Sequence, residues 1–144
     1  MKAFLDTNII LDLLLEREGC EDCAQILDMA EDGHLNLYIS ALTMVNVAYV
    51  YRKAVGKNAV IPNLKILNSV FNVIPTTPDD IDDALYLQGN DYEDVVQAIS
   101  ASKAGCEIII TRNTKDFHIG KGLKTPPVFP TIKTPKEFLA GRIK

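Results

Sequence analysis

Three polar clusters carry the residues of this sequence that could do chemistry. The first is Asp6-Thr7-Asn8, directly after an apolar stretch, the second is Asp91-Tyr92-Glu93-Asp94, and the third runs from Thr111 to Phe117. Clustered carboxylates repel one another in a poorly hydrated cleft unless a cation or a shared proton compensates them. Oxygen ligands without His or Cys suit Mg²⁺ or Mn²⁺, and such ions can activate water for phosphodiester hydrolysis.

Each acid also has an ordinary structural explanation. Asp91 and Asp94 stand near the start of an expected helix, where the helix dipole favours negative charge. Asp116 before Phe117 fits a turn, and Asp6 at the end of an expected strand is either a functional group or a buried cap. Taken singly, such an acid is more often a cap than a ligand, so the clusters matter only if the fold brings them together.

Hydrophobic periodicity predicts strands that alternate with helices. Strands are expected at 2–5, 35–39, 71–74, 107–110 and 128–132, and helices at 9–17, 24–30, 41–55, 78–89 and 92–104, with one more helix that has Pro62 in its first turn and a short one opened by Thr134. Thr7 or Asn8 is expected to cap the first helix, and Ser40 the helix from Ala41. This alternation predicts a parallel sheet covered by helices on both faces, so the fold class is α/β. Parallel crossovers can bring all three polar clusters to one edge of that sheet.

The composition is that of an ordinary globular protein. The chain has 144 residues, 47% apolar and 24% charged, which predicts a single domain over residues 1–144. No apolar run approaches the ~20 residues of a membrane-spanning helix, and polar residues interrupt any signal-like start, so we expect a cytoplasmic protein with no membrane contact. Three cysteines argue against a disulfide framework, and Cys20 and Cys23 are expected to be half-buried helix residues one turn apart.

Charge is distributed unevenly along the chain, whose net charge is −4. Residues 111–144 carry eight Lys and Arg against two acids, whereas residues 1–110 carry seven against seventeen. The asymmetry could separate an acidic site from a basic rim that binds phosphates, or it could be a surface property without functional meaning. The sequence favours neither of these two interpretations over the other.

Three motifs taken together resemble the PIN-domain family. They are Phe-Leu-Asp-Thr-Asn-Ile-Ile-Leu-Asp at residues 4–12, Asp-Tyr-Glu-Asp-Val-Val-Gln-Ala at 91–98 and Ile-Ile-Thr-Arg-Asn-Thr-Lys-Asp-Phe at 109–117. The resemblance implies a three-layer α/β/α sandwich around a mostly parallel sheet of four to five strands. It also implies Mg²⁺- or Mn²⁺-dependent nuclease activity, as in the VapC-type toxins of the family, which cleave RNA.

The resemblance suggests roles for the polar residues. Asp6, Asp94 and Asp116 are implied as catalytic, metal-binding acids. Residues expected to hydrogen-bond these acids or a phosphate are Asn8, Ser40, Asn46, Thr111 and Asn113. Residues expected to hold the nucleic-acid backbone are Arg112, Lys115 and Lys121.

Position 46 departs from the family pattern. The family has a Glu in the helix that follows the second strand, and the segment Ser40–Val47 places Asn46 there. An amide supplies an oxygen but no charge, so it should hold a divalent ion less strongly. Asp91, one turn from Asp94, is a candidate for the missing carboxylate and thus for a metal ligand. The site is therefore expected to be rearranged or weakened.

Two functions are compatible with these features. The first is a divalent-metal-dependent ribonuclease that hydrolyses RNA, with a role as the toxin of a toxin–antitoxin pair and an antitoxin protein as partner. The second is a catalytically weakened PIN-like module that binds nucleic acid or another protein. A phosphatase of the haloacid-dehalogenase type fits poorly, because it would need Asp-x-Asp where this chain has Asp6-Thr7-Asn8. The helices at 9–15 and 41–51 are more apolar than one core-facing stripe requires, which predicts a homodimer.

Overall fold

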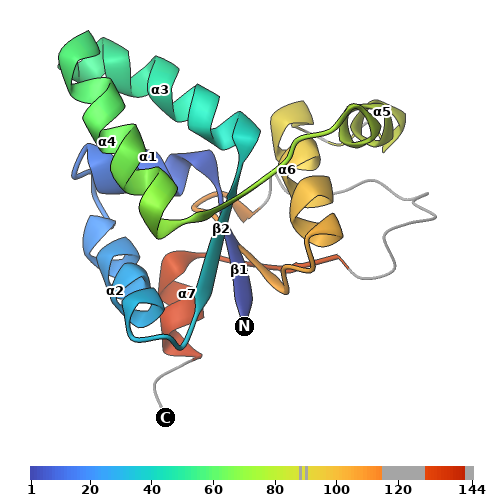
Figure 1. The fold of residues 1–144 in the computed structure, drawn as a ribbon. Coiled ribbons are helices and arrows are strands. Elements are labelled where there is room, and N and C mark those ends of the chain that lie inside the picture. The colour runs from blue at the N-terminus through green and yellow to red at the C-terminus, as the bar shows by residue number, and fades with distance from the viewer. Residues whose placement is uncertain (88, 90, 115–128, 142–144) are drawn as a thin grey trace.

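A parallel sheet of five strands forms the centre of the molecule (Figure 1). The computed structural model of the chain describes residues 1–87, 89, 91–114 and 129–141. The strands are β1 (Lys2–Leu5), β2 (Asn36–Ser40), β3 (Asn72–Ile74), β4 (Ile108–Ile110) and β5 (Thr131–Lys133). Their order across the sheet is β3-β2-β1-β4-β5, and all neighbours pair in parallel. The predicted α/β class is confirmed.

Helices cover both faces of this sheet (Figure 1). One face carries α1 (Thr7–Leu14), α2 (Cys20–Glu31), α3 (Ala41–Val55), α4 (Lys57–Val70) and α7 (Pro135–Ala140). The other face carries α6 (Tyr92–Lys103), against which α5 (Pro78–Leu87) packs. The result is the expected three-layer α/β/α sandwich. None of the helices in the described part of the chain is both long and apolar enough to cross a membrane.

Strand β1 shows how one short apolar segment builds both layers. Ala3 and Leu5 are fully buried in the core beneath the larger group of helices, while Phe4 between them is buried in the core beneath α6. Successive side chains of a strand point to opposite faces of the sheet. Three successive apolar residues in β1 therefore require cover on both faces of the sheet, as is usual for parallel sheets.

The strand order reverses at β1. The chain leaves β1 towards β2 and β3, and later returns to β4 on the other side of β1. Because Leu5 pairs with Ile110, the next residues, Asp6 and Thr111, lie beside each other at the carboxyl edge of the sheet. Ligands of open α/β sheets bind in the crevice at such a reversal.

Two local predictions are wrong, and one is confirmed. Asp6, rather than Thr7 or Asn8, occupies the N-cap of α1, and its own side chain makes no capping hydrogen bond. Pro62 is the sixth residue of α4, because α4 begins directly after Gly56, whose φ of 84° ends α3. Ser40 caps α3 as expected, since its Oγ accepts a hydrogen bond from the Thr43 backbone N–H at 3.1 Å.

The cysteines are packing residues. All three are free thiols, with Cys20 half-buried in α2 and Cys23 buried one turn later. Burial raises the pKa of Cys23 and of Cys106 to about 11, so both thiols stay protonated near neutral pH. Reactive and metal-binding cysteines act as thiolates, so neither of these two is suited to such a role.

Candidate active site

Asp6 lies at the reversal point of the sheet with its carboxylate turned inward. Asp6 is only 3% exposed, and its backbone N–H continues the sheet by donating a hydrogen bond to the Ile110 carbonyl at 3.0 Å. The carboxylate accepts hydrogen bonds from Thr111 Oγ1 at 2.9 Å and from Gln97 Nε2 at 3.2 Å. The carboxylate is therefore held in place by one side chain from the end of β4 and one from α6, and does not cap its own helix.

The surroundings of Asp6 disfavour its charge. Burial raises the pKa of this carboxyl above its ordinary value, and the negative charge of Glu93 raises it further. The hydrogen bonds from Thr111 and Gln97 act in the opposite direction and are outweighed. Among the residues that the structure describes, neither Asp6 nor Glu93 forms an ion pair with a Lys or Arg side chain.

Gln97 joins two of the predicted metal-binding acids. Its Nε2 lies 3.2 Å from Asp6 Oδ1 and 3.5 Å from Asp94 Oδ1, and its Oε1 accepts from the Thr7 backbone N–H at 3.4 Å. Gln97 is fully buried in α6. The sequence analysis did not single it out, although it stands three residues after Asp94 and so shares that helical face. The structure thus brings Asp6 and Asp94 together through one amide.

Asp91 caps a helix. It is the N-cap residue of α6, where its Oδ1 accepts the Asp94 backbone N–H at 3.2 Å. It is also exposed to solvent. Asp91 therefore acts as a helix cap, and its role as a metal ligand stays a prediction.

Asn46 faces a carboxylate, but not that of Asp91. Its Nδ2 donates a hydrogen bond of 2.9 Å to Glu93 Oε1, which joins α3 to the first turn of α6. The two side chains line a cavity of about 290 Å³ whose other walls include Thr7 and Asn8 of α1. Glu93 was not predicted as a site residue, because in the sequence it resembles any acid in the first turn of a helix.

A chain of buried hydroxyls lies beneath this edge. Thr7 Oγ1 donates to Thr43 Oγ1 at 3.3 Å, and Thr43 Oγ1 lies 3.1 Å from Ser40 Oγ. All three residues are buried, and Ser40 is only 1% exposed. The Thr7–Thr43 bond links α1 to α3, and Ser40 holds Thr43 in place. Of the two predicted roles of Ser40, the supporting one therefore fits its burial better than direct contact with a phosphate.

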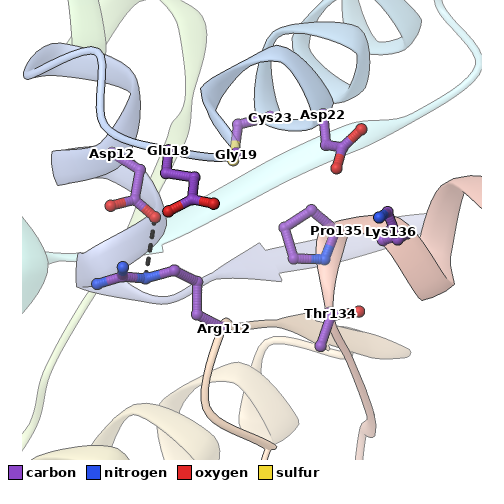
Figure 2. Close-up of a pocket in the computed structure, with 9 residues that line it drawn as sticks. All are labelled: Asp12, Glu18, Gly19, Asp22, Cys23, Arg112, Thr134, Pro135 and Lys136. Carbon is purple, nitrogen blue, oxygen red and sulfur yellow. Dashed lines mark ion pairs between the residues drawn. The ribbon is translucent and has the colours of Figure 1, made fainter.

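The segment after β4 is anchored on both sides. Asn113 donates its backbone N–H to Thr111 Oγ1 at 3.2 Å, so Thr111 serves the loop as well as Asp6. Arg112 Nε forms an ion pair of 3.0 Å with Oδ2 of Asp12, a residue of α1 that is 1% exposed (Figure 2). The remaining predicted residues of this segment, Lys115, Asp116 and Lys121, lie outside the described residues.

The pocket beside the Arg112–Asp12 ion pair is separate from the candidate site. It measures about 340 Å³, and Figure 2 shows that its walls include Glu18, Asp22 and Lys136. Its lining bears both signs of charge and includes none of Asp6, Glu93 and Asp94. This cavity is therefore not the one that adjoins Asp6, Glu93 and Asp94.

The donor set fits a hard divalent cation. Asp6, Glu93 and Asp94 bring only carboxylate oxygens to this edge, and such ligands suit Mg²⁺ and Mn²⁺. Asp6 is buried beside the charge of Glu93, and without a basic partner among the described residues these two carboxylates need a cation to ionise together. In the described parts of the chain, no three His, Cys, Asp or Glu side chains are close enough to enclose a metal ion. The chemistry of these oxygen donors therefore fits a divalent ion, although the described residues alone do not enclose one.

Comparisons with known proteins identify the family of this chain. The model of the PIN domain family matches residues 2–115, which include β1, α6 and β4. Ribonuclease VapC1 of Aquifex aeolicus (strain VF5) is 27% identical over 123 residues, which cover 81% of this chain and 84% of that protein.

Solved structures show the same likeness. A toxin–antitoxin complex from Klebsiella pneumoniae matches with a TM-score of 0.63 and 27% identity, over 92% of this chain and 97% of that chain. VapBC2 from Rickettsia felis, bound to a DNA fragment from its promoter, matches with a TM-score of 0.68 and 18% identity, over 93% of this chain and 98% of that chain. The family match covers well over half of the chain, including the strands and helix that carry Asp6, Asp94 and Thr111. The chain belongs to the PIN-domain family and has a VapC-like fold.

Proposed function

We propose that this protein is a divalent-metal-dependent ribonuclease that hydrolyses RNA phosphodiester bonds and serves as the toxin of a toxin–antitoxin pair. The observation that carries the proposal is Asp6, a buried carboxylate at the reversal point of the sheet whose side-chain hydrogen-bond partners among the described residues are all neutral. Ribonuclease VapC1, a relative at 27% identity, and the toxin–antitoxin complex from Klebsiella pneumoniae support the reaction class and the biological setting.

The residues of this chain would act by holding and orienting. Asp6 and Asp94, with Asp116 as the third acid, would hold Mg²⁺ or Mn²⁺, and the bound ion supplies an activated water and stabilises the departing oxygen. Thr111 fixes one oxygen of Asp6 and Gln97 the other, so the carboxylate keeps one orientation. Such outer partners set the direction of metal-binding acids. Asn8 and Asn113 are exposed next to these groups and would meet the phosphate.

Basic residues after β4 would hold the RNA backbone. Arg112 uses Nε for its ion pair with Asp12, and its side chain is 48% exposed, so its terminal nitrogens remain within reach of a phosphate. Lys115 and Lys121 belong to the same basic stretch of sequence. Contacts of this kind add affinity without base specificity and weaken as salt rises.

Two further associations belong to the proposal. The toxin role implies an antitoxin protein as partner and a cytoplasmic location. Helix α3 exposes Val45 and Tyr49, which are 68% and 64% exposed, and this apolar surface supports a homodimer. An exposed apolar patch of this kind is a common mark of a protein interface.

A second candidate function is supported by Asn46. Because an amide stands where the family has a Glu, the chain could be a module that binds nucleic acid or a protein without cutting. Titration of the protein with Mn²⁺ in a calorimeter separates the two candidates. Retained RNA binding without any heat of Mn²⁺ binding at millimolar metal would favour the binding module.

The principal experiment removes the two described acids one at a time. Asp6→Asn and Asp94→Asn should each lower Mg²⁺- or Mn²⁺-stimulated RNA cleavage by about a thousandfold, since metal-based charge stabilisation contributes several kcal/mol to such reactions. Asp79→Asn is the matched control, because Asp79 is an exposed acid in the first turn of α5, as Asp94 is an acid in the first turn of α6. Full cleavage by either site variant would contradict the proposal.

A further inference from the structure

The contact between Asn46 and Glu93 bears on the acid that the family pattern lacks. We propose that Glu93 supplies this carboxylate from α6, and that Asn46 acts as the positioning residue that aims it at the metal site. The inference rests on the proposed function, because it adds a ligand to the same site. It replaces the candidate Asp91, whose carboxylate serves as the cap of α6.

The hydrogen bond gives the two residues complementary parts. The amide nitrogen of Asn46 can only donate, and the carboxylate of Glu93 can only accept when ionised, so the bond of 2.9 Å fixes one Glu93 oxygen and leaves the other available. A Glu at position 46 would instead place two negative charges against each other. The amide of Asn46 on α3 and the carboxylate of Glu93 on α6 are therefore a matched pair. Relative to the family pattern, the negative charge lies on α6 and not on α3.

The position of Glu93 differs from that of an ordinary acid in a first turn. Glu21 is also the second residue of its helix, α2, and it is exposed and forms no hydrogen bond or ion pair with the described residues. Glu93 is half-buried and bonded to a different helix, and it lines a cavity with Thr7 and Asn8, the residues that follow Asp6. The helix dipole favours both acids, but only Glu93 faces the proposed site.

Glu93 and Asp94 approach Asp6 from two directions. Adjacent residues of a helix project about 100° apart, so neighbouring acids do not face the same side. Glu93 turns to Asn46 of α3, whereas Asp94 lies against Gln97, which also bonds Asp6. Two consecutive residues can thus bring carboxylates to separate sides of the same buried acid.

The test measures Mn²⁺ affinity of the purified protein by calorimetry, with RNA cleavage as a second readout. Glu93→Gln keeps shape and removes the charge, and should weaken Mn²⁺ binding by on the order of a hundredfold, while Asn46→Ala should weaken it by about tenfold, as loss of an orienting partner does. The swap variant with both Asn46→Glu and Glu93→Gln restores one amide and one acid across the same contact, and should bind Mn²⁺ more tightly than Glu93→Gln alone. Glu21→Gln is the matched control and should bind Mn²⁺ as the native protein does.

The outcomes separate this inference from the function on which it rests. Native Mn²⁺ affinity in Glu93→Gln, or a swap variant no better than Glu93→Gln, overturns the role of Glu93. If Asp6→Asn loses Mn²⁺ binding in the same series, the proposed function stands while the inference fails. If Asp6→Asn binds Mn²⁺ normally, the location of the metal site itself is wrong. Circular dichroism of each variant verifies that the fold is retained.

Discussion

Asp80 and Asp6 are two buried acids at the starts of helices, with 2% and 3% of their surfaces exposed. Asp80 is surrounded by donors that favour its charge. It accepts from the Thr77 backbone N–H at 3.0 Å and from Ser100 Oγ at 2.9 Å, and forms an ion pair of 2.8 Å with Lys103 Nζ. These partners outweigh burial and lower the pKa of the Asp80 carboxyl.

Asp6 has no such compensation in the part of the chain that the structure describes. Its partners there, Thr111 and Gln97, are neutral, and the nearby charge of Glu93 is of the same sign, so the pKa of Asp6 is raised. A buried acid with a basic partner joins two helices, as Asp80 joins α5 to α6. A buried acid whose partners are neutral is instead suited to bind a cation. On the proposed function, the same residue type at similar depth therefore stabilises the fold as Asp80 and binds metal as Asp6.

The gain in stability from bound metal should depend on Asp6 and not on Asp80. Mn²⁺ at about a hundred times its Kd should raise the free energy of unfolding of the native protein by about 2.7 kcal/mol, because it binds the folded state alone. Asp80→Asn should show the same gain, and Asp6→Asn should show almost none. Urea unfolding with Mn²⁺ and with EDTA measures this difference. An equal gain in Asp6→Asn would contradict the contrast.

Removing the charge of Asp80 should lower stability without touching the site. Asp80→Asn should reduce the free energy of unfolding by about 2 kcal/mol, since it disrupts charge-assisted bonds to a buried group. In EDTA, Asp6→Asn should lose less, because ionised Asp6 is itself disfavoured by burial. RNA cleavage by folded Asp80→Asn should match that of the native protein. A larger loss of stability in Asp6→Asn would reverse the assignment of the two acids.

Lowering the pH should change the contributions of Asp80 and Asp6 to the free energy of unfolding in opposite directions. This is the smallest expected effect. The lowered pKa of Asp80 means that its contribution is present above the unfolded value of about 3.9 and is lost as pH falls through the folded pKa. The raised pKa of Asp6 means that its contribution is present below about 3.9 and is lost as pH rises through the folded pKa. In EDTA, the advantage of the native protein over Asp80→Asn should therefore shrink on acidification. Its stability relative to Asp6→Asn should increase, as unfolding curves over an acid series will show.

Local patterns predicted the frame of the molecule. The apolar run at Ile108–Ile110 and the alternation of strands with helices indicated a parallel sheet, and the end of the first strand located Asp6 at its edge. These features depend on residues close in sequence, where periodicity and turn residues act. The cap of α3 by Ser40 was predictable for the same reason.

Contacts between distant residues were beyond such patterns. Asn46 bonds Glu93 across 47 positions and Gln97 bonds Asp6 across 91, and no local rule selects either pair. In the sequence, Asp79 and Asp80 are ordinary acids of a first helical turn, whereas the ion pair of Asp80 with Lys103 depends on how α5 packs against α6. Even the N-cap of α1 was misassigned, because the side chain of Asp6 is directed by α6 and β4.

The bond between Thr111 and Asp6 joins residues 105 positions apart, across the central pair of parallel strands. Such distant pairs form late in folding, because the entropy cost of closing a long loop comes before the stabilising contacts are made. A growing chain on the ribosome contains Asp6 long before Gln97 and Thr111 have been translated. On the proposed function, a nascent segment without these two residues lacks the hydrogen bonds that orient Asp6 and should therefore not cut RNA.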